Sequence, residues 1–102
     1  MTLQAVLDTY RRLPLETKSQ MEDVIQSVID EEEMIVINSS ELGNKILRLA
    51  SSVDWKRECG PFSRQCFGIL LRDYLAEQPD WSEPFEEKFA GRKQKIYYLD
   101  VD

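Results

Sequence analysis

The fold is decided by residues 34–42, which read Met-Ile-Val-Ile-Asn-Ser-Ser-Glu-Leu. The run at 34–37 is rich in β-branched residues and too short for an independent helix, so it predicts a short strand. Asn38 precedes Glu41 by three positions, a near match to the capping box that starts a helix. We therefore expect the strand to pass directly into a helix over about 39–52, with an apolar side made of Leu42, Ile46, Leu49 and Ala50.

Two helices are expected before this stretch. Apolar residues at helical spacing predict a first helix over residues 3–12, with Thr2 as its N-cap, and Pro14 ends it. A second helix is predicted from Leu15 or Glu16 to about Glu33. Its single apolar stripe consists of Met21, Val24, Ile25, Val28 and Ile29.

The chain after residue 52 predicts a connection, a helix and a hairpin. Residues 53–62 contain Trp55 and the Gly60-Pro61 turn, and they are interpreted as a connection. Ser63 is the expected N-cap of a helix from 64 to about 77. Strands are predicted at 85–89 and 94–101, joined by a turn over residues 90–93 in which Gly91 is free to take positive φ. The face of the last strand is expected to carry Lys95, Tyr97, Leu99 and Val101.

From residue 16, the expected order is helix, short strand, helix, helix, strand, turn, strand. This order resembles the winged-helix family of helix-turn-helix domains. The segments Ser39–Leu42 and Phe62–Leu71 are similar to the winged-helix modules of phage and plasmid primase–helicase proteins. The resemblance implies one α+β, mainly α domain of 102 residues, with 1–15 as an N-terminal helical addition to a core at 16–101. The acidic connection at 78–84 departs from the family pattern.

The composition argues against catalysis. The chain has no histidine, which removes the usual general base at neutral pH. Its four glycines stand apart, so no glycine-rich phosphate loop is present. Cys59 and Cys66 are not spaced as a metal pair and are interpreted as a loop thiol and a core residue. We expect no enzymatic activity, no cofactor and no metal.

The apolar runs are only a few residues long, whereas a membrane span needs about 20 residues. The N-terminus lacks a basic region followed by an apolar stretch, so it does not predict a signal peptide. A protein of the cytoplasm, with no membrane partner, is therefore expected.

Charge is divided unevenly along the chain. The formal net charge is −6, which argues against a general nucleic-acid binder. Two segments are nevertheless basic, because residues 45–72 and 88–95 each carry +4. Residues 1–33 and 73–87 are acidic, at −5 and −6. The basic segments coincide with the presumed helix-turn-helix core and the wing.

The resemblance therefore implies DNA binding. Ser63, Arg64 and Gln65 would lie at the amino end of the recognition helix, near base edges. Arg92, Lys93 and Lys95 on the wing would contact phosphates or an adjacent minor groove. Lys56 and Arg57, before the recognition helix, are also expected to bind nucleic acid. The hypothesis is a small non-enzymatic protein that binds DNA, as a transcription regulator or an accessory module of a mobile element.

Several alternatives stay open. The acidic surface favours a protein-interaction module or an acidic inhibitor that binds a basic partner, and acids over the recognition face would support it. The basic hairpin tip is also typical of an exposed strand edge that resists aggregation. Trp55 and Trp81 are interpreted as core caps or partner anchors. A homodimer is expected through the first helix, with an interface of Leu3, Val6, Leu7 and Tyr10.

Overall fold

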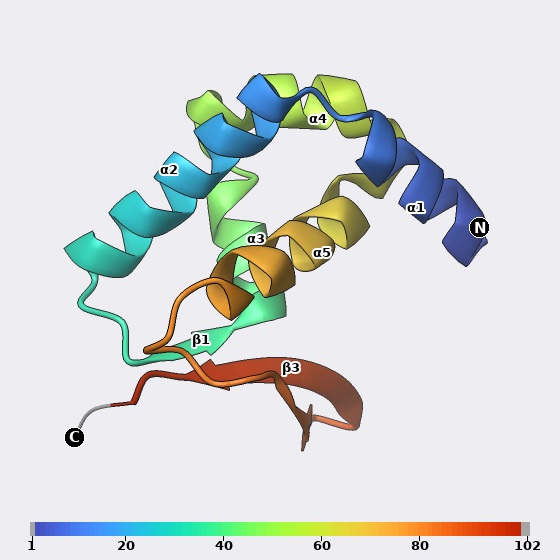
Figure 1. The fold of residues 1–102 in the computed structure, drawn as a ribbon. Helices are drawn as coiled ribbons and strands as arrows, with labels where there is room; N and C mark the ends of the chain where they lie inside the picture. The colour runs from blue at the N-terminus through green and yellow to red at the C-terminus, as the bar shows by residue number, and fades with distance from the viewer. Residues whose placement is uncertain (1, 101–102) are drawn as a thin grey trace.

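Helices form one layer of this computed structural model and a small sheet lies beneath them (Figure 1). The structure describes residues 2–100, which are α+β and mainly helical, as predicted. The helices are α1 (Leu3–Arg12), α2 (Leu15–Glu31), α3 (Ser39–Ile46), α4 (Val53–Cys59) and α5 (Ser63–Ala76). The strands are β1 (Val36–Asn38), β2 (Phe85–Phe89) and β3 (Arg92–Tyr98), and single 3-10 turns span Ala50–Ser52 and Gly60–Phe62.

The two N-terminal helices confirm the sequence pattern. The Thr2 hydroxyl accepts a hydrogen bond from the backbone N–H of Ala5 at 3.3 Å, so Thr2 is the N-cap of α1. The second helix ends at Glu31, slightly earlier than expected. Glu33 then takes a left-handed conformation with φ of 48°, which turns the chain away from the helix axis toward β1.

The passage from β1 into α3 also follows the prediction. Asn38 accepts a hydrogen bond from the backbone N–H of Glu41 at 3.1 Å and caps α3. Its amide also donates to the side chain of Gln94 on β3. The strand lies at 36–38 instead of 34–37, because β3 pairs with Val36, Ile37 and Asn38.

The helix expected over 39–52 is shorter, and this part of the prediction is wrong. The α3 helix ends at Ile46, and Leu49 is extended, with φ of −77° and ψ of 147°. The buried Ser52 hydroxyl lies within hydrogen-bonding distance of the carbonyl oxygens of Leu47 and Leu49, which stabilises this break. Leu49 and Ala50 are consequently exposed, and Leu47 is buried in their place.

The predicted connection at 53–62 is also wrong, since most of it forms α4 and a 3-10 turn. Trp55 is 1% exposed, and its indole N–H donates to the carbonyl oxygen of Ser63 at 3.0 Å. Cys59 is buried in α4, so it is no loop thiol, whereas Cys66 is a core residue as expected. The extra helix forms because it buries these side chains against α5.

The α5 helix lies at the centre and contacts the other four helices (Figure 1). It begins at Ser63, whose hydroxyl donates to the carbonyl oxygen of Gly60 at 2.9 Å, so the prediction that Ser63 is the N-cap is wrong. The core side of α5 consists of Cys66, Phe67, Leu70, Leu71 and Leu75. Gly43 brings α3 against this side, because a Cβ there would lie 3.1 Å from the Phe67 ring.

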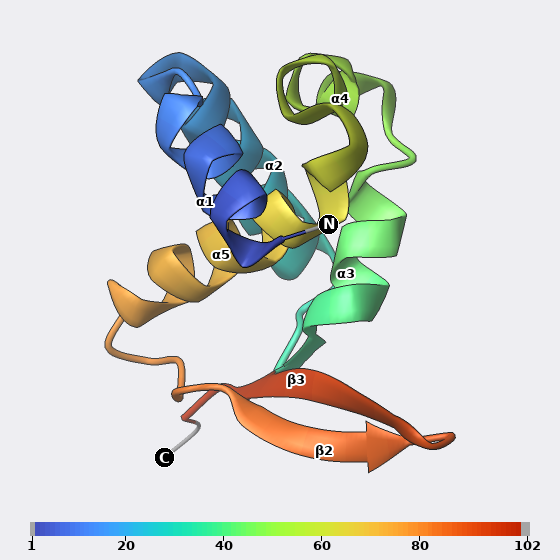
Figure 2. The ribbon, with the colours of Figure 1, turned by 90° about the vertical axis from the view of Figure 1, so that its right-hand side faces the viewer.

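The sheet has the antiparallel order β1-β3-β2, with β2 and β3 forming a hairpin (Figure 2). Ala90 and Gly91 both have positive φ, as a tight two-residue hairpin turn requires. The last strand begins at residue 92 instead of 94, because the turn is only these two residues, and it ends at residue 98. Tyr97 is buried and Lys95 is exposed, while Leu99 forms an isolated bridge with Trp81. Val101 lies outside the described residues.

Candidate nucleic-acid interface

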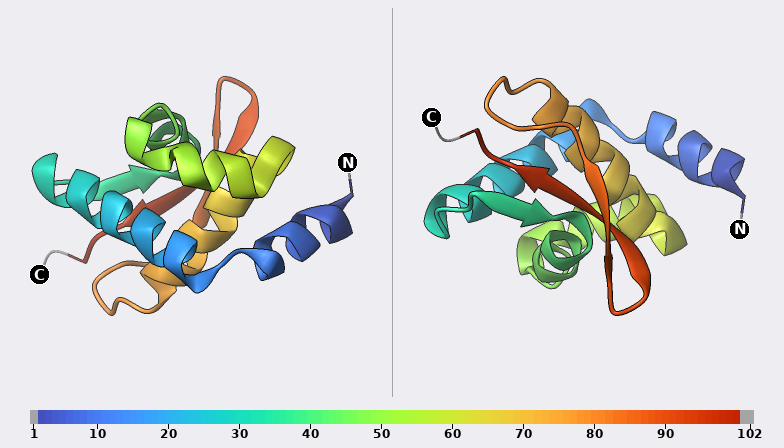
Figure 3. Two further views of the ribbon diagram at one scale, coloured as in Figure 1. Left: turned by 90° about the horizontal axis from the view of Figure 1, so that it is seen from above. Right: turned by 90° about the horizontal axis from the view of Figure 1, so that it is seen from below.

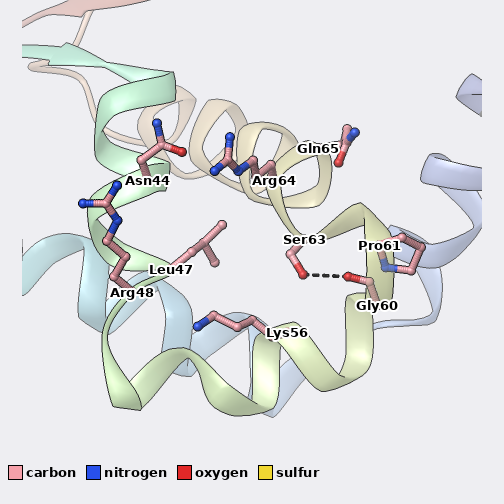
Figure 4. A pocket seen from close by; sticks show the side chains of 9 residues that line it. All are labelled: Asn44, Leu47, Arg48, Lys56, Gly60, Pro61, Ser63, Arg64 and Gln65. Atoms are coloured by element: carbon pink, nitrogen blue, oxygen red, sulfur yellow. Dashed lines mark hydrogen bonds between the residues drawn. The ribbon is translucent and has the colours of Figure 1, made fainter.

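A hollow of about 460 Å³ opens where α3, α4 and the first turn of α5 meet (Figure 4). The α3 side contributes Asn44, Leu47 and Arg48, and α4 contributes Lys56. The remaining lining residues belong to the entry into α5 and its first turn, and they are Gly60, Pro61, Ser63, Arg64 and Gln65. Three segments of the chain thus surround the amino end of the central helix.

Every charged residue that lines this hollow is a cation: Arg48, Lys56 and Arg64. No salt bridge involves any of the three within residues 2–100. Cations without a carboxylate partner keep their electrostatic attraction for an external anion. The partial positive charge at the amino end of α5 adds to this attraction.

The α4 helix is what places Lys56 beside α5. Trp55 fixes α4 through its buried ring and its hydrogen bond to the first residue of α5. Neighbouring residues on a helix point about 100° apart, so burying Trp55 turns Lys56 outward to the hollow. Arg57 forms an exposed salt bridge with Asp54 at 2.8 Å instead of lining the hollow.

The three residues expected at the start of the recognition helix are placed differently from one another. Arg64 is exposed and points toward Asn44 and Arg48, whereas Gln65 points the other way (Figure 4). The Ser63 hydroxyl donates to Gly60, and this bond helps to hold the turn before α5. Of the three, Arg64 therefore has the geometry best suited to contact an external ligand.

The hairpin provides a second group of cations. Arg92, Lys93 and Lys95 are exposed on β3, and Lys88 on β2 lies directly opposite Lys93. Like charges directly opposite one another destabilise a sheet, so an anion near this pair would relieve repulsion. The hairpin tip projects from the same side of the molecule as α3 and α4 (Figures 2 and 3). A single extended ligand could therefore approach the hollow and the hairpin from one side.

Three residues with polar or charged side chains on this surface were not among the site residues predicted from the sequence: Asn44, Arg48 and Lys88. Asn44 and Arg48 are four positions apart and lie on the polar side of the chain around the end of α3. That spacing places both residues on one side of the expected helix, but it does not place them beside α5. The role of Lys88 depends on the strand register, which brings it opposite Lys93.

The four residues predicted to form a dimer interface differ in how far they are exposed. Val6 is buried in the core of its own chain, and Tyr10 packs against that core and donates to the Asp73 carboxylate at 3.3 Å. Burial, together with the charge of Asp73, raises the pKa of Tyr10 to about 12. Leu3 is 73% exposed and Leu7 is half-buried. Val6 thus stabilises the packing of α1 within the chain, which corrects its expected role, whereas Tyr10 stays partly exposed.

No family model, no curated protein and no solved structure matches this chain. Within the described part of the chain, no helix combines the length and the apolar character needed to cross a bilayer.

Proposed function

We propose that this chain is a winged-helix protein that binds DNA through α5 and the β2–β3 hairpin. The observation that carries the proposal is the hollow at the amino end of α5, whose charged lining residues are Arg48, Lys56 and Arg64. A basic surface around a helix end is typical of helix-turn-helix proteins that contact the DNA backbone. The net charge of −6 does not oppose this, because no Asp or Glu lines the hollow. On the hairpin, Glu86 lies opposite Lys95.

The arrangement of elements supports the winged-helix part of the proposal. The helices α2, α3 and α5 and the strands follow the expected order, and β1 pairs with β3. The hairpin is thereby anchored to the strand that leads into α3, as a wing beside a helix-turn-helix core would be. One difference is the segment 47–62, which contains α4 where a helix-turn-helix has a turn of about 3–4 residues.

The same hollow favours DNA over the alternative of an acidic inhibitor. That alternative expects carboxylates over the recognition face, whereas the lining of the hollow contains no Asp or Glu. In the DNA-bound state, Arg64 would contact a base edge or a phosphate, and Arg48 and Lys56 would contact phosphates. The regulator and the mobile-element module differ in their DNA targets, and both require this surface.

Fluorescence anisotropy tests the proposal, with a labelled mixed-sequence duplex and a labelled single strand as ligands. We expect duplex binding at about 50 mM salt that weakens by roughly ten- to a hundredfold at about 200 mM salt, because a few phosphate contacts release counterions. Stronger binding of the single strand would argue against the winged-helix geometry. An unchanged anisotropy with both ligands at low salt would contradict the proposal.

A further inference from the structure

A second surface lies where the end of α2, the loop after α5 and the end of β3 come together (Figure 1). Two adjoining hollows of about 480 and 440 Å³ open there, and both are lined by Asp80, Trp81 and Leu99. We call this surface the Trp81 groove. Its other main lining residues are Met34 and Ile35 in the first hollow and Phe85 and Tyr98 in the second.

The Trp81 groove is apolar in places that are open to solvent. Ile35 is 56% exposed and Phe85 is 54% exposed. Trp81 is half-buried and packs against the core. The Phe85 ring meets the Tyr98 ring edge-on, with 5.6 Å between their centroids. Adjoining exposed apolar side chains of this kind mark surfaces that bind another molecule.

The charge on the groove has a single sign. Its charged lining residues are Asp30, Glu33, Asp80 and Asp100, and neither hollow is lined by a lysine or an arginine from the described residues. An apolar floor with carboxylates around it matches a ligand that carries both apolar and cationic side chains. Nucleic acid would be repelled by the same carboxylates.

Backbone hydrogen bonds hold the groove in shape. The N–H of Leu99 donates to the carbonyl oxygen of Ile35 at 2.9 Å, and the N–H of Asp100 donates to that of Asp80 at 2.7 Å. Trp81 and Leu99 also form a bridge. The three segments are thus joined before any ligand binds, which lowers the entropy cost of binding.

We infer that the Trp81 groove binds a basic segment of a protein partner, with an apolar side chain seated against Trp81 and arginine or lysine side chains near Asp30 and Asp80. The groove lies at the end of the molecule away from the amino end of α5 (Figures 1 and 3). A chain that binds DNA could therefore bind this partner at the same time. The inference does not depend on DNA binding, since it uses other residues.

The intrinsic fluorescence of the protein tests this inference. The chain has two tryptophans, and Trp55 is 1% exposed, so a ligand in the groove changes the emission of Trp81 alone. The probes are three capped five-residue peptides without tryptophan, which alternate arginine with leucine, arginine with serine, and glutamate with leucine. We expect the arginine–leucine peptide to bind at least tenfold more tightly than the other two, because it supplies both apolar and cationic groups.

Charge-matched variants separate the groove from general attraction to an acidic protein. Asp30→Asn with Asp80→Asn should weaken binding of the arginine–leucine peptide by roughly tenfold. Asp23→Asn with Glu58→Gln removes the same charge from exposed sites outside both hollows and should change binding less than twofold. Amide chemical-shift changes in the native protein should gather around Trp81 and Leu99.

Three results would overturn the inference. One is an unchanged Trp81 emission at saturating peptide. Another is equal weakening by the two double variants, which would indicate attraction to net charge alone. The third is equal binding of the arginine–serine peptide, which would show that the apolar floor has no part in recognition.

Discussion

At the scale of single residues, Gly43 and Gly68 both lie in helices but differ in the space available for a side chain. A Cβ on Gly43 would lie 3.1 Å from the ring of Phe67, which is almost fully buried. A Cβ on Gly68 would have no heavy atom within 4 Å. Gly43 is thus required for the approach of α3 to α5, whereas the packing of the folded chain does not require Gly68.

The same substitution at the two glycines should therefore have opposite effects on stability. Gly43→Ala is expected to lower the free energy of unfolding by about 1 kcal/mol, because overpacking of about 1–3 kcal/mol exceeds the gain of about 1 kcal/mol in helix propensity. Gly68→Ala should raise it by about 0.5–1 kcal/mol. Urea unfolding measures both changes, and a stabilising Gly43→Ala would show that α3 and α5 are not closely packed there.

Gly68 also has a predicted role in binding. It follows Arg64 by one helical turn, and the space over it would let α5 approach a ligand closely. Gly68→Ala is expected to weaken DNA binding several-fold while the protein becomes more stable. The anisotropy assay measures this change. Binding as tight as that of the unmodified chain would show that DNA does not approach α5 at this position.

The Cys59 thiol gives a prediction on pH. Burial, with a smaller effect of the nearby Cys66, raises the pKa of Cys59 from 9.0 to about 12. The unfolded chain then loses this proton at lower pH than the folded chain. The protonated thiol therefore makes its full contribution to the free energy of unfolding below about pH 9, and this contribution is lost as the pH rises through about 12. The free energy of unfolding, measured with urea, should fall less between pH 8 and pH 10.5 for Cys59→Ala than for the unmodified chain. An equal fall would contradict the raised pKa of Cys59.

At the scale of elements, α4 shows where sequence reasoning reaches its limit. The long helix α2 and the caps at Thr2 and Asn38 were predictable, because periodicity and capping are local properties. Residues 53–59 have no apolar stripe long enough to indicate a helix on their own. The helix depends on burying Trp55 and Cys59 against α5, which is a tertiary effect. The early end of α3 likewise depends on the contacts of the buried Ser52 hydroxyl.

The same limit applies to the candidate site. Arg64 and Lys56 were predictable from the charge pattern and from their place beside the presumed recognition helix. Arg48 was not, because it comes next to α5 only when α3 ends at Ile46 and the chain turns into α4. The position of Lys88 opposite Lys93 was not predictable either, because it depends on the register of the hairpin.

The hairpin should contribute phosphate contacts without base specificity. Arg92→Gln with Lys93→Gln is expected to reduce the slope of log K against log salt by about 2, because two counterion-releasing contacts are lost. Preference among duplex sequences should stay the same. Anisotropy at four salt concentrations gives the slope, and an unchanged slope would show that the hairpin stays away from DNA.

At the scale of the whole molecule, the fold separates charges that the net value of −6 conceals. Cations line the hollow at the amino end of α5, while carboxylates surround the Trp81 groove. The hairpin carries both signs, since Lys88 lies opposite Lys93 and Glu86 lies opposite Lys95. The two proposals together predict that one chain binds DNA at the first surface and a basic protein segment at the second.

The most direct test of DNA binding compares two double variants that remove equal charge. Arg48→Gln with Arg64→Gln alters the hollow, whereas Arg11→Gln with Arg12→Gln removes two exposed cations from α1, on the other side of the molecule from the hairpin (Figure 3). Anisotropy with the mixed-sequence duplex at low salt should show affinity lowered at least tenfold for the first variant and less than about threefold for the second. Equal losses would mean that the duplex responds only to net charge, and would contradict a DNA interface at the amino end of α5.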